Sequence, residues 1–291
     1  MKFNKFALSE LATTKYGKNQ KKVLSESGNV PIYGTGGLMG YATTALYDEP
    51  SVLIGRKGTI GKVKYVEHPF WTVDTLFYTI VNTDIVLPKY LYYIMSLIDL
   101  NNYNEGTTIP SLRTETLNRL EFDIPDLEEQ RKILSCLNPI DEKIELNNAI
   151  NNNLEQQAQA IYQQMFIDNA SSDWTEGTLS DIADITMGQS PSGSSYNEDG
   201  NGTIFFQGRA EFGFRFPTVR LYTTEPKRMA CANDTLMSVR APVGDLNVAH
   251  TDCCIGRGLA AIHSKNNHQS FVLYTMFSLK KQLDVFNGEG T

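Results

Sequence analysis

Hydrophobic and polar positions follow two different periods along the chain. Alternating apolar residues, which are typical of half-buried strands, predict three β-strands at 51–55, 60–66 and 76–81. An amphipathic helix is predicted near 88–99, where Pro88 occupies a helix-start position. A shorter helix is predicted from Leu8 to Thr13, capped by Ser9. The first 120 residues therefore indicate a domain of mixed helices and strands.

The period changes after residue 125, where apolar residues step by four and three. Asp126 is expected to cap a helix, with Glu129 as the reciprocal member of the capping box. Pro139 is expected either to kink this helix or to start a second one. A helix over 140–167 would be about 42 Å long at 1.5 Å per residue. The seam positions are Ile133, Leu137, Ile140, Ile144, Asn147, Asn151, Leu154, Ala158, Ile161 and Met165.

This 3.5-residue repeat is typical of a coiled coil, in which the two asparagines would fix the register of the helices. Such a seam must be buried against another helix. The alternative is that the helix folds back on its own domain, and the sequence leaves both interpretations open.

The chain repeats itself, because five short phrases recur in the same order. The clearest is Leu8-Ser9-Glu10-Leu11-Ala12, which returns as Leu179-Ser180-Asp181-Ile182-Ala183. Others pair 31–34 with 204–208, 52–56 with 236–240, 91–97 with 273–279, and Gly106-Thr107 with Gly290-Thr291. The third pair would place Arg56 and Arg240 at equivalent positions. An ordered series of this kind predicts a duplication.

The predicted fold is α+β, with two mixed α/β domains joined by a long coiled-coil-type helix. The expected boundaries are 1–124 for the first domain, 125–170 for the helix and 171–291 for the second domain. The second copy stops at Gly290-Thr291, so a second long helix is expected to be absent and this domain incomplete at its C-terminal end.

Charge is distributed unevenly over these three parts. Residues 1–120 carry 13 Lys and Arg against 10 Asp and Glu, residues 121–174 carry 3 against 11, and residues 175–291 carry 10 against 12. The overall net charge of −7 is unusual for an autonomous DNA-binding protein. Its distribution instead favours basic outer surfaces and an acidic middle with a different partner.

Cysteine and hydropathy patterns indicate a reduced, cytoplasmic protein without a membrane span. The four cysteines form no Cys-x-x-Cys pair, and we expect reduced, buried thiols. The cysteines and the four scattered histidines do not assemble a recognisable four-ligand zinc site, so neither a metal nor a cofactor is expected. No apolar run approaches the roughly 18–20 residues of a membrane helix, and no secretory signal is evident.

Motifs of the common enzyme classes are missing, and no catalytic residue is predicted. The sequence has no adenine-methyltransferase Asn-Pro-Pro-aromatic motif, no phosphate-binding Gly-Lys-Ser/Thr loop and no Gly-x-Gly-x-x-Gly after a strand. A nuclease could use Asp126, Asp141 and Lys143, but all three fall in the helical pattern, where their side chains would not share a metal. An enzyme with an unrecognised motif is a further alternative.

Basic and amide side chains near glycine-rich segments are the candidates for DNA contacts. Lys and Arg neutralise phosphates, and Arg and Gln make two-pronged contacts with guanine and adenine edges. For each residue the alternative is a solvated charge or an internal ion pair, and for the pair Arg56 and Arg240 it is a shared structural role. The candidates are Arg56, Lys57, Lys62, Lys64, Gln207, Arg209, Arg215, Arg240 and Arg257.

The join between the first copy and the helix resembles a known family. The phrases are Gly-Thr-Thr-Ile-Pro-Ser-Leu-Arg at 106–113, Leu-Glu-Phe-Asp-Ile-Pro at 120–125 and Leu-Glu-Glu-Gln-Arg-Lys-Ile at 127–133, together with Gly-Gln-Ser-Pro-Ser-Gly at 188–193. In order, they resemble the specificity (S) subunits of type I restriction–modification systems, over essentially the whole chain.

The resemblance implies a non-catalytic protein that recognises double-stranded DNA. Each of two target recognition domains would read one half of a split site. The long helix would set the gap between the halves and dock methyltransferase subunits, two in number, while the chemistry would belong to them and to a separate restriction subunit. Without a second helix, two chains could pair through the seam. The alternative is a coiled-coil adaptor that does not read DNA.

Overall fold

The computed structural model describes residues 2–240, 242–283 and 285 as two compact units, 1–147 and 148–291. The predicted helix contributes to both units, because the division falls between Asn147 and Asn148. Among the helices of the described residues, none is both long enough and apolar enough to cross a membrane.

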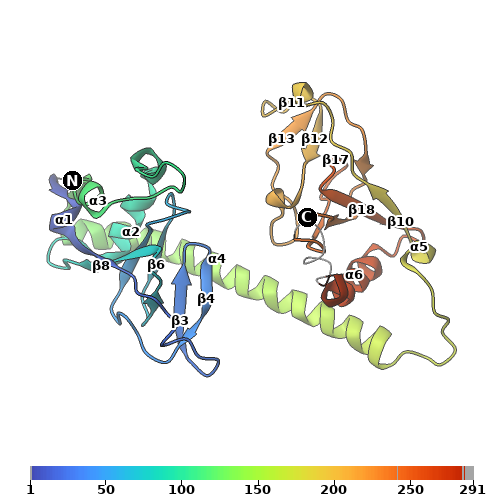
Figure 1. Ribbon diagram of the computed structural model, residues 1–291, viewed down its shortest axis with the longest axis horizontal. Helices are drawn as coiled ribbons and strands as arrows, with labels where there is room; N and C mark the ends of the chain where they lie inside the picture. The colour runs from blue at the N-terminus through green and yellow to red at the C-terminus, as the bar shows by residue number, and fades with distance from the viewer. Residues whose placement is uncertain (1, 241, 284, 286–291) are drawn as a thin grey trace. The chain divides into compact units, whose positions relative to one another are not determined.

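Unit 1 combines three β-sheets with short helices (Figure 1). Its sheets are ordered β1-β9, β2-β8-β5-β6 and β4-β3-β7. The strands are β1 Phe3–Ala7, β2 Ala12–Tyr16, β3 Val30–Gly34, β4 Gly37–Ala42, β5 Ser51–Gly55, β6 Val63–Val66, β7 Trp71–Thr72, β8 Leu76–Val81 and β9 Glu121–Pro125. The helices are α1 Leu8–Leu11, α2 Pro88–Ser96, η1 Leu100–Tyr103, α3 Thr114–Asn118 and the first part of α4 Leu127–Tyr162.

Unit 2 is built from two sheets, ordered β10-β18-β15-β16 and β11-β13-β12-β17-β14. Its strands are β10 Ala183–Met187, β11 Tyr196–Asn197, β12 Thr203–Phe206, β13 Leu221–Thr223, β14 Met229–Ala230, β15 Thr235–Ser238, β16 Leu246–Val248, β17 Cys253–Ile255 and β18 Leu259–Ser264. Its helices are the end of α4, the π-helix η2 Gln163–Asp168, α5 Leu179–Ile182, η3 Gly193–Ser195, η4 Arg209–Glu211 and α6 Gln269–Leu283.

The two units share one plan, which confirms the predicted duplication. The sheet β2-β8-β5-β6 corresponds to β10-β18-β15-β16, and the parallel pair β3–β7 corresponds to β12–β17. A buried apolar cluster lies beneath each four-stranded sheet. In unit 1 it includes Phe77 and Leu91, and in unit 2 Ile262 and Val272. The predicted repeat of Gly106-Thr107 at residues 290–291 lies outside the described residues.

The predicted elements of unit 1 are found with three corrections. The strands at 51–55 and 76–81 are β5 and β8. Pro88 is the first residue of α2, but this helix ends at Ser96 rather than near residue 99. The strand expected at 60–66 begins only at Val63, because the apolar Ile60 is buried within a loop. The first helix ends at Leu11 rather than Thr13, since Ala12 already belongs to β2, and Ser9 is not its cap.

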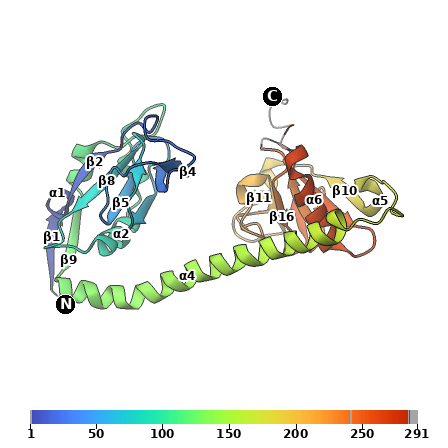
Figure 2. The ribbon, with the colours of Figure 1, turned by 90° about the horizontal axis from the view of Figure 1, so that it is seen from below.

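Helix α4 begins at its predicted cap, Asp126, but Glu129 does not act as the reciprocal member of the predicted capping box. The backbone N–H of Glu129 donates to the Asp126 carboxylate at 2.9 Å, whereas the Glu129 carboxylate binds Lys132. The helix continues through Pro139 without a break, although proline supplies no N–H for a helical hydrogen bond. Figure 2 shows α4 as one continuous helix.

The start of α4 is fixed to unit 1 by a buried glutamine. Gln130 is fully buried, and its amide oxygen accepts from the Leu87 N–H at 2.8 Å. Its amide nitrogen donates to the carbonyls of Ile85 and Pro125, each at 2.9 Å. Leu134, one turn later, joins the apolar core.

Candidate nucleic-acid interface

Two glycine-rich loops lie side by side in unit 1. They are the β3–β4 turn at 35–36 and the β5–β6 loop at 56–62. A Cβ atom added to Gly58 would lie 4.0 Å from Thr35 Oγ1, so the loops approach closely. Gly37 and Gly58 have φ angles of +114° and +83°, a region in which other residues are strained. The loops border a groove of about 320 Å³ that Lys62 and Lys64 also line.

Three predicted lysines present their charge at this place. Lys57, Lys62 and Lys64 are exposed. The Lys64 ammonium lies 4.0 Å from the centroid of the Tyr33 ring, within cation–π range, and its partial burial lowers the pKa of Lys64. The structure thus brings Lys62 and Lys64 together at a concave surface lined by glycine backbone, an arrangement that suits a phosphate group.

Arg56 is bound within the unit. Its guanidinium donates to the Asp74 carbonyl at 2.7 Å and lies 5.0 Å from the centroid of the Tyr16 ring. Its backbone N–H also bonds the Thr75 carbonyl, at 2.9 Å. These contacts tie the end of β5 to the β7–β8 turn and favour a structural role for Arg56.

Three of the unit 2 candidates surround the turn at 256–258. A Cβ atom on either Gly256 or Gly258 would lie 2.9 Å from the carbonyl oxygen of Gln207, so only glycine allows this approach. The exposed Arg257 lies between the two glycines. The segment leading to the exposed Arg240 is joined to the same turn, because Val239 N–H donates to the Gly258 carbonyl at 3.0 Å.

The other two candidates of unit 2 are engaged in ion pairs. Arg209 is paired with Asp245. Arg215 is paired with Glu155 on α4, and its guanidinium donates to the Tyr274 hydroxyl at 3.2 Å. Their charges are already matched within unit 2, as the alternative of internal ion pairs anticipated.

Strand register corrects the predicted equivalence of Arg56 and Arg240. Gly55 lies opposite Leu76 in unit 1, and Ser238 lies opposite Leu259 in unit 2. Leu76 and Leu259 are 183 residues apart. The same offset separates Val81 from Ser264, which pair with the repeated alanines Ala12 and Ala183. With this offset the counterpart of Arg56 is Val239, and the counterpart of Arg240 is Lys57. The sequence alignment was wrong by one residue because the glycine-rich loops offered no fixed point.

Most of the predicted seam on α4 is exposed. Ile133, Leu137 and Ala158 are half-buried, whereas Asn147 and Asn151 are exposed. The helix is therefore packed on unit 1 only near its start. The exposed apolar members are Ile140, Ile144, Leu154, Ile161 and Met165, each with 53–58% of its surface accessible.

The residues of the alternative nuclease are not assembled into a site. Asp126 caps α4, whereas Asp141 accepts from the Tyr93 hydroxyl and pairs with Lys89 at 3.0 Å. Asp126 and Asp141 are about 22 Å apart along the helix at 1.5 Å per residue. These carboxylates and Lys143 cannot share a metal ion in this arrangement.

One polar cluster was not expected from the sequence. Cys231, Asp234 and His263 place potential ligand atoms within 4.8 Å of one another. His263 is distant in sequence from the other two, and strand pairing brings it there. The prediction of four buried thiols is wrong for Cys136 and Cys231, which are exposed, and holds for Cys253 and Cys254.

The fold and these surfaces define a class of protein. It is a duplicated protein of mixed helices and strands, whose two units present basic side chains at equivalent glycine-rich turns. Residues 1–156 match the family model described as the type I restriction modification DNA specificity domain. The chain belongs to this family.

Relatives of the chain carry the same description. The MjaX type I restriction enzyme specificity subunit of Methanocaldococcus jannaschii is 33% identical over 230 residues, which cover 71% of this chain and 54% of that protein. The HindI specificity subunit of Haemophilus influenzae is 35% identical over 117 residues, covering 37% and 26%. The chain thus spans about half the length of the first relative and about a quarter of the second.

A solved structure has the same fold. The S subunit of a type I restriction–modification system from M. genitalium superposes with a TM-score of 0.57 at 18% identity, covering 99% of this chain and 80% of that one. At this identity the similarity concerns the fold, with two mixed α/β units and a long helix.

Proposed function

We propose that this chain recognises DNA sequence as a specificity subunit of a type I restriction–modification complex and performs no catalysis itself. Each unit, with its predicted domain at 1–124 or 171–291, would read one half of a split double-stranded site. Family membership supports the general role.

The observation that carries the proposal is the exposed basic residue at the same register position of both units. Lys57 lies two residues after the end of β5, and Arg240 lies two residues after the end of β15. In each unit the residue between them and the strand donates its backbone N–H to the turn before the neighbouring strand. Around them, Lys62 and Lys64 in unit 1 and Gln207 and Arg257 in unit 2 supply phosphate and base-edge contacts. Arginine can bind guanine through two hydrogen bonds, and lysine can contact guanine or phosphate.

Helix α4 is proposed as the docking element for two methyltransferase subunits, with the restriction subunit joining that assembly. Its exposed seam offers apolar side chains to a helical partner. Its acidic character disfavours contact with DNA, so we expect weak DNA affinity for the isolated chain. If two chains paired through the seam, each would bury the exposed apolar side chains of the other.

The test is co-expression with the methyltransferase subunit of the same restriction–modification system, followed by genome-wide mapping of methylated bases. A split motif with a fixed gap is expected, and a palindromic motif would mean that two copies of one unit are used. A stable complex that neither methylates nor binds DNA in a salt-dependent manner would overturn the proposal in favour of an adaptor. Tight site-specific binding by the isolated chain at about 150 mM salt would contradict the need for a partner.

A further inference from the structure

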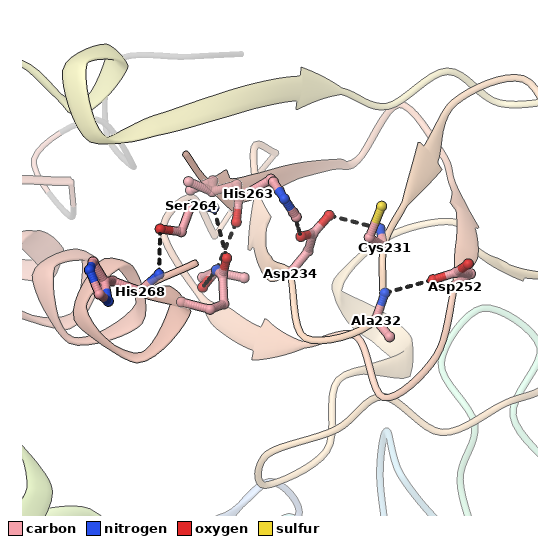
Figure 3. Close-up of polar contacts among 10 residues, drawn as sticks. Cys231, Ala232, Asp234, Asp252, His263, Ser264 and His268 are labelled. Carbon is pink, nitrogen blue, oxygen red and sulfur yellow. Dashed lines mark hydrogen bonds and ion pairs between the residues drawn. The ribbon is translucent and has the colours of Figure 1, made fainter. Parts of the chain in front are cut away.

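Three side chains of different chemistry converge where the inner strands β15 and β18 meet at one end of the four-stranded sheet of unit 2 (Figure 3). Cys231 and Asp234 come from the turn that leads into β15, and His263 comes from β18. The thiol sulfur, a carboxylate oxygen and an imidazole nitrogen all lie within 4.8 Å of one another. Sulfur, nitrogen and oxygen donors at this separation are the ligand types that zinc and neighbouring transition metals accept.

The carboxylate at the centre of the cluster is buried and held in place. Asp234 is only 3% exposed, and its two oxygens accept from the Cys231 backbone N–H at 2.8 Å and contact His263 Nδ1 at 2.6 Å. Among the described residues, its ion-pair partner within 4.0 Å is this histidine rather than a lysine or arginine. Cys231 and His263 are exposed, so solvent ions reach the cluster from their side.

The surroundings of the cluster are negative. Asp252 approaches the same turn, where it accepts from the Ala232 N–H at 2.8 Å. The charge of Asp234, then burial, then the charge of Asp252 raise the pKa of the Cys231 thiol. This potential disfavours a free thiolate and therefore a nucleophilic cysteine, whereas it attracts a cation.

The shared plan of the two units does not require this cluster. With the 183-residue offset, its members fall on Asp48, Ser51 and Ile80 of unit 1. There the Ser51 hydroxyl donates to the Thr79 carbonyl at 2.7 Å, and Ile80 offers no ligand atom. In unit 1 a serine hydroxyl bonds the neighbouring strand at the position of Asp234. Cys231, Asp234 and His263 are therefore specific to unit 2.

We propose that Cys231, Asp234 and His263 form a binding site for one Zn²⁺ ion, with water as the fourth ligand. The thiol would lose its proton to solvent, and the hydrogen bond between histidine and aspartate would be replaced by a bond from each to the metal. Typical bonds of about 2.0–2.3 Å require the three groups to draw together slightly. The ion would fasten the start of β15 to β18 and stabilise unit 2 by binding the folded state.

The first test is metal titration of the purified full chain, free of any affinity tag and treated with a chelator. Calorimetry with Zn²⁺ is expected to show one ion per chain, and Co²⁺ used as a probe should give a thiolate-to-cobalt absorption band. Cys231→Ser should abolish that band and weaken Zn²⁺ binding at least about tenfold. Cys136→Ser removes the other exposed thiol and should change neither result.

The second test uses a histidine pair and thermal unfolding. Zn²⁺ should raise the melting temperature of the original chain and of the control His268→Asn, but not that of His263→Asn. Both substituted histidines are exposed, so both variants should fold. Absence of stoichiometric binding by the original chain, or binding that survives both Cys231→Ser and His263→Asn, would overturn the proposal. Neither readout depends on DNA recognition.

Discussion

Units 1 and 2 share their backbone contacts at the joint between their sheets and differ in the side chains that this joint carries. In unit 1, Gly17 N–H bonds the Leu76 carbonyl at 3.0 Å, and in unit 2, Gly188 N–H bonds the Leu259 carbonyl at 2.9 Å. Both glycines also lie against a second backbone carbonyl. A Cβ atom on Gly17 would lie 2.0 Å from the Val73 carbonyl oxygen, and one on Gly188 would lie 2.2 Å from the Gly256 carbonyl oxygen. The joint between the two sheets is therefore the same main-chain structure twice.

The side chains carried by this joint have diverged. Gly34 of unit 1 corresponds to Gln207 of unit 2, because each comes directly after the last residue of the parallel pairing, Tyr33 in β3 and Phe206 in β12. Asp74 corresponds to Arg257 by the 183-residue offset. Unit 1 thus has an aspartate and a glycine at the two positions where unit 2 has an arginine and a glutamine. Under the proposed function, this constant frame with variable residues would let the two units of one chain recognise different half-sites.

The largest effect that would break this comparison comes from the paired glycines. Gly17→Ala and Gly188→Ala should each destabilise their own unit by about 3 kcal/mol, because the added methyl group meets backbone that cannot move aside. Chemical denaturation, followed by a probe in each unit, measures the change.

The matched controls are Gly36→Ala and Gly193→Ala, since nothing lies within 4 Å of a Cβ atom at either position. Both should stay within about 0.5 kcal/mol of the original chain. Equal tolerance at Gly188 and Gly193, with loss only at Gly17, would mean that the two joints are not equivalent.

A smaller effect should separate the two units in function. In the complex with methyltransferase, Lys57→Ala and Arg240→Ala should each weaken binding by about 1–3 kcal/mol, roughly 5- to 150-fold, because each removes one proposed DNA contact. If each unit reads one half-site, Lys57→Ala should relax discrimination in one half of the motif and Arg240→Ala in the other. Competition binding with half-site mutants measures both changes.

Lys265→Ala is the control, because Lys265 follows the end of β18 that lies away from the turn at 256–258. It should leave binding unchanged. Arg56→Ala should lower the stability of unit 1, since Arg56 is bound to Asp74 and Tyr16. A loss of discrimination in the same half-site from Lys57→Ala and Arg240→Ala would reject the assignment of one half to each unit.

The sequence predicted what depends on local pattern and missed what depends on register. Alternation identified β5 and β8 to the residue, and Pro88 marked the start of α2. Ile60 misled the prediction because burial in a loop resembles burial in a strand. The pairing of Arg56 with Arg240 failed because the offset is set by hydrogen bonding between strands.

The candidate site shows the same limit. Nothing in the spacing distinguishes Arg215, which is paired with Glu155 sixty residues away, from the exposed Arg240. The approach of His263 to Cys231 and Asp234 likewise follows from strand order. Such long-range contacts require the fold, whereas the repeat and the long helix are visible in the sequence.

The smallest effect compares one half-buried carboxylate in each unit at acid pH. Burial alone would raise the pKa of Asp141 and of Asp245, but hydrogen bonds from Tyr93 and Lys89 in one case, and from Lys280 and Arg209 in the other, outweigh it and lower both. A carboxylate with a lower pKa in the folded state stabilises above its unfolded value of about 3.9, and this contribution is lost as the pH falls through the folded value. Asp141→Asn and Asp245→Asn should therefore reduce stability at pH 7, by about 1 kcal/mol or less, and reduce the further loss below about pH 4. Unfolding curves between pH 7 and pH 2 measure this, and an unchanged acid slope in both variants would show that neither ion pair contributes.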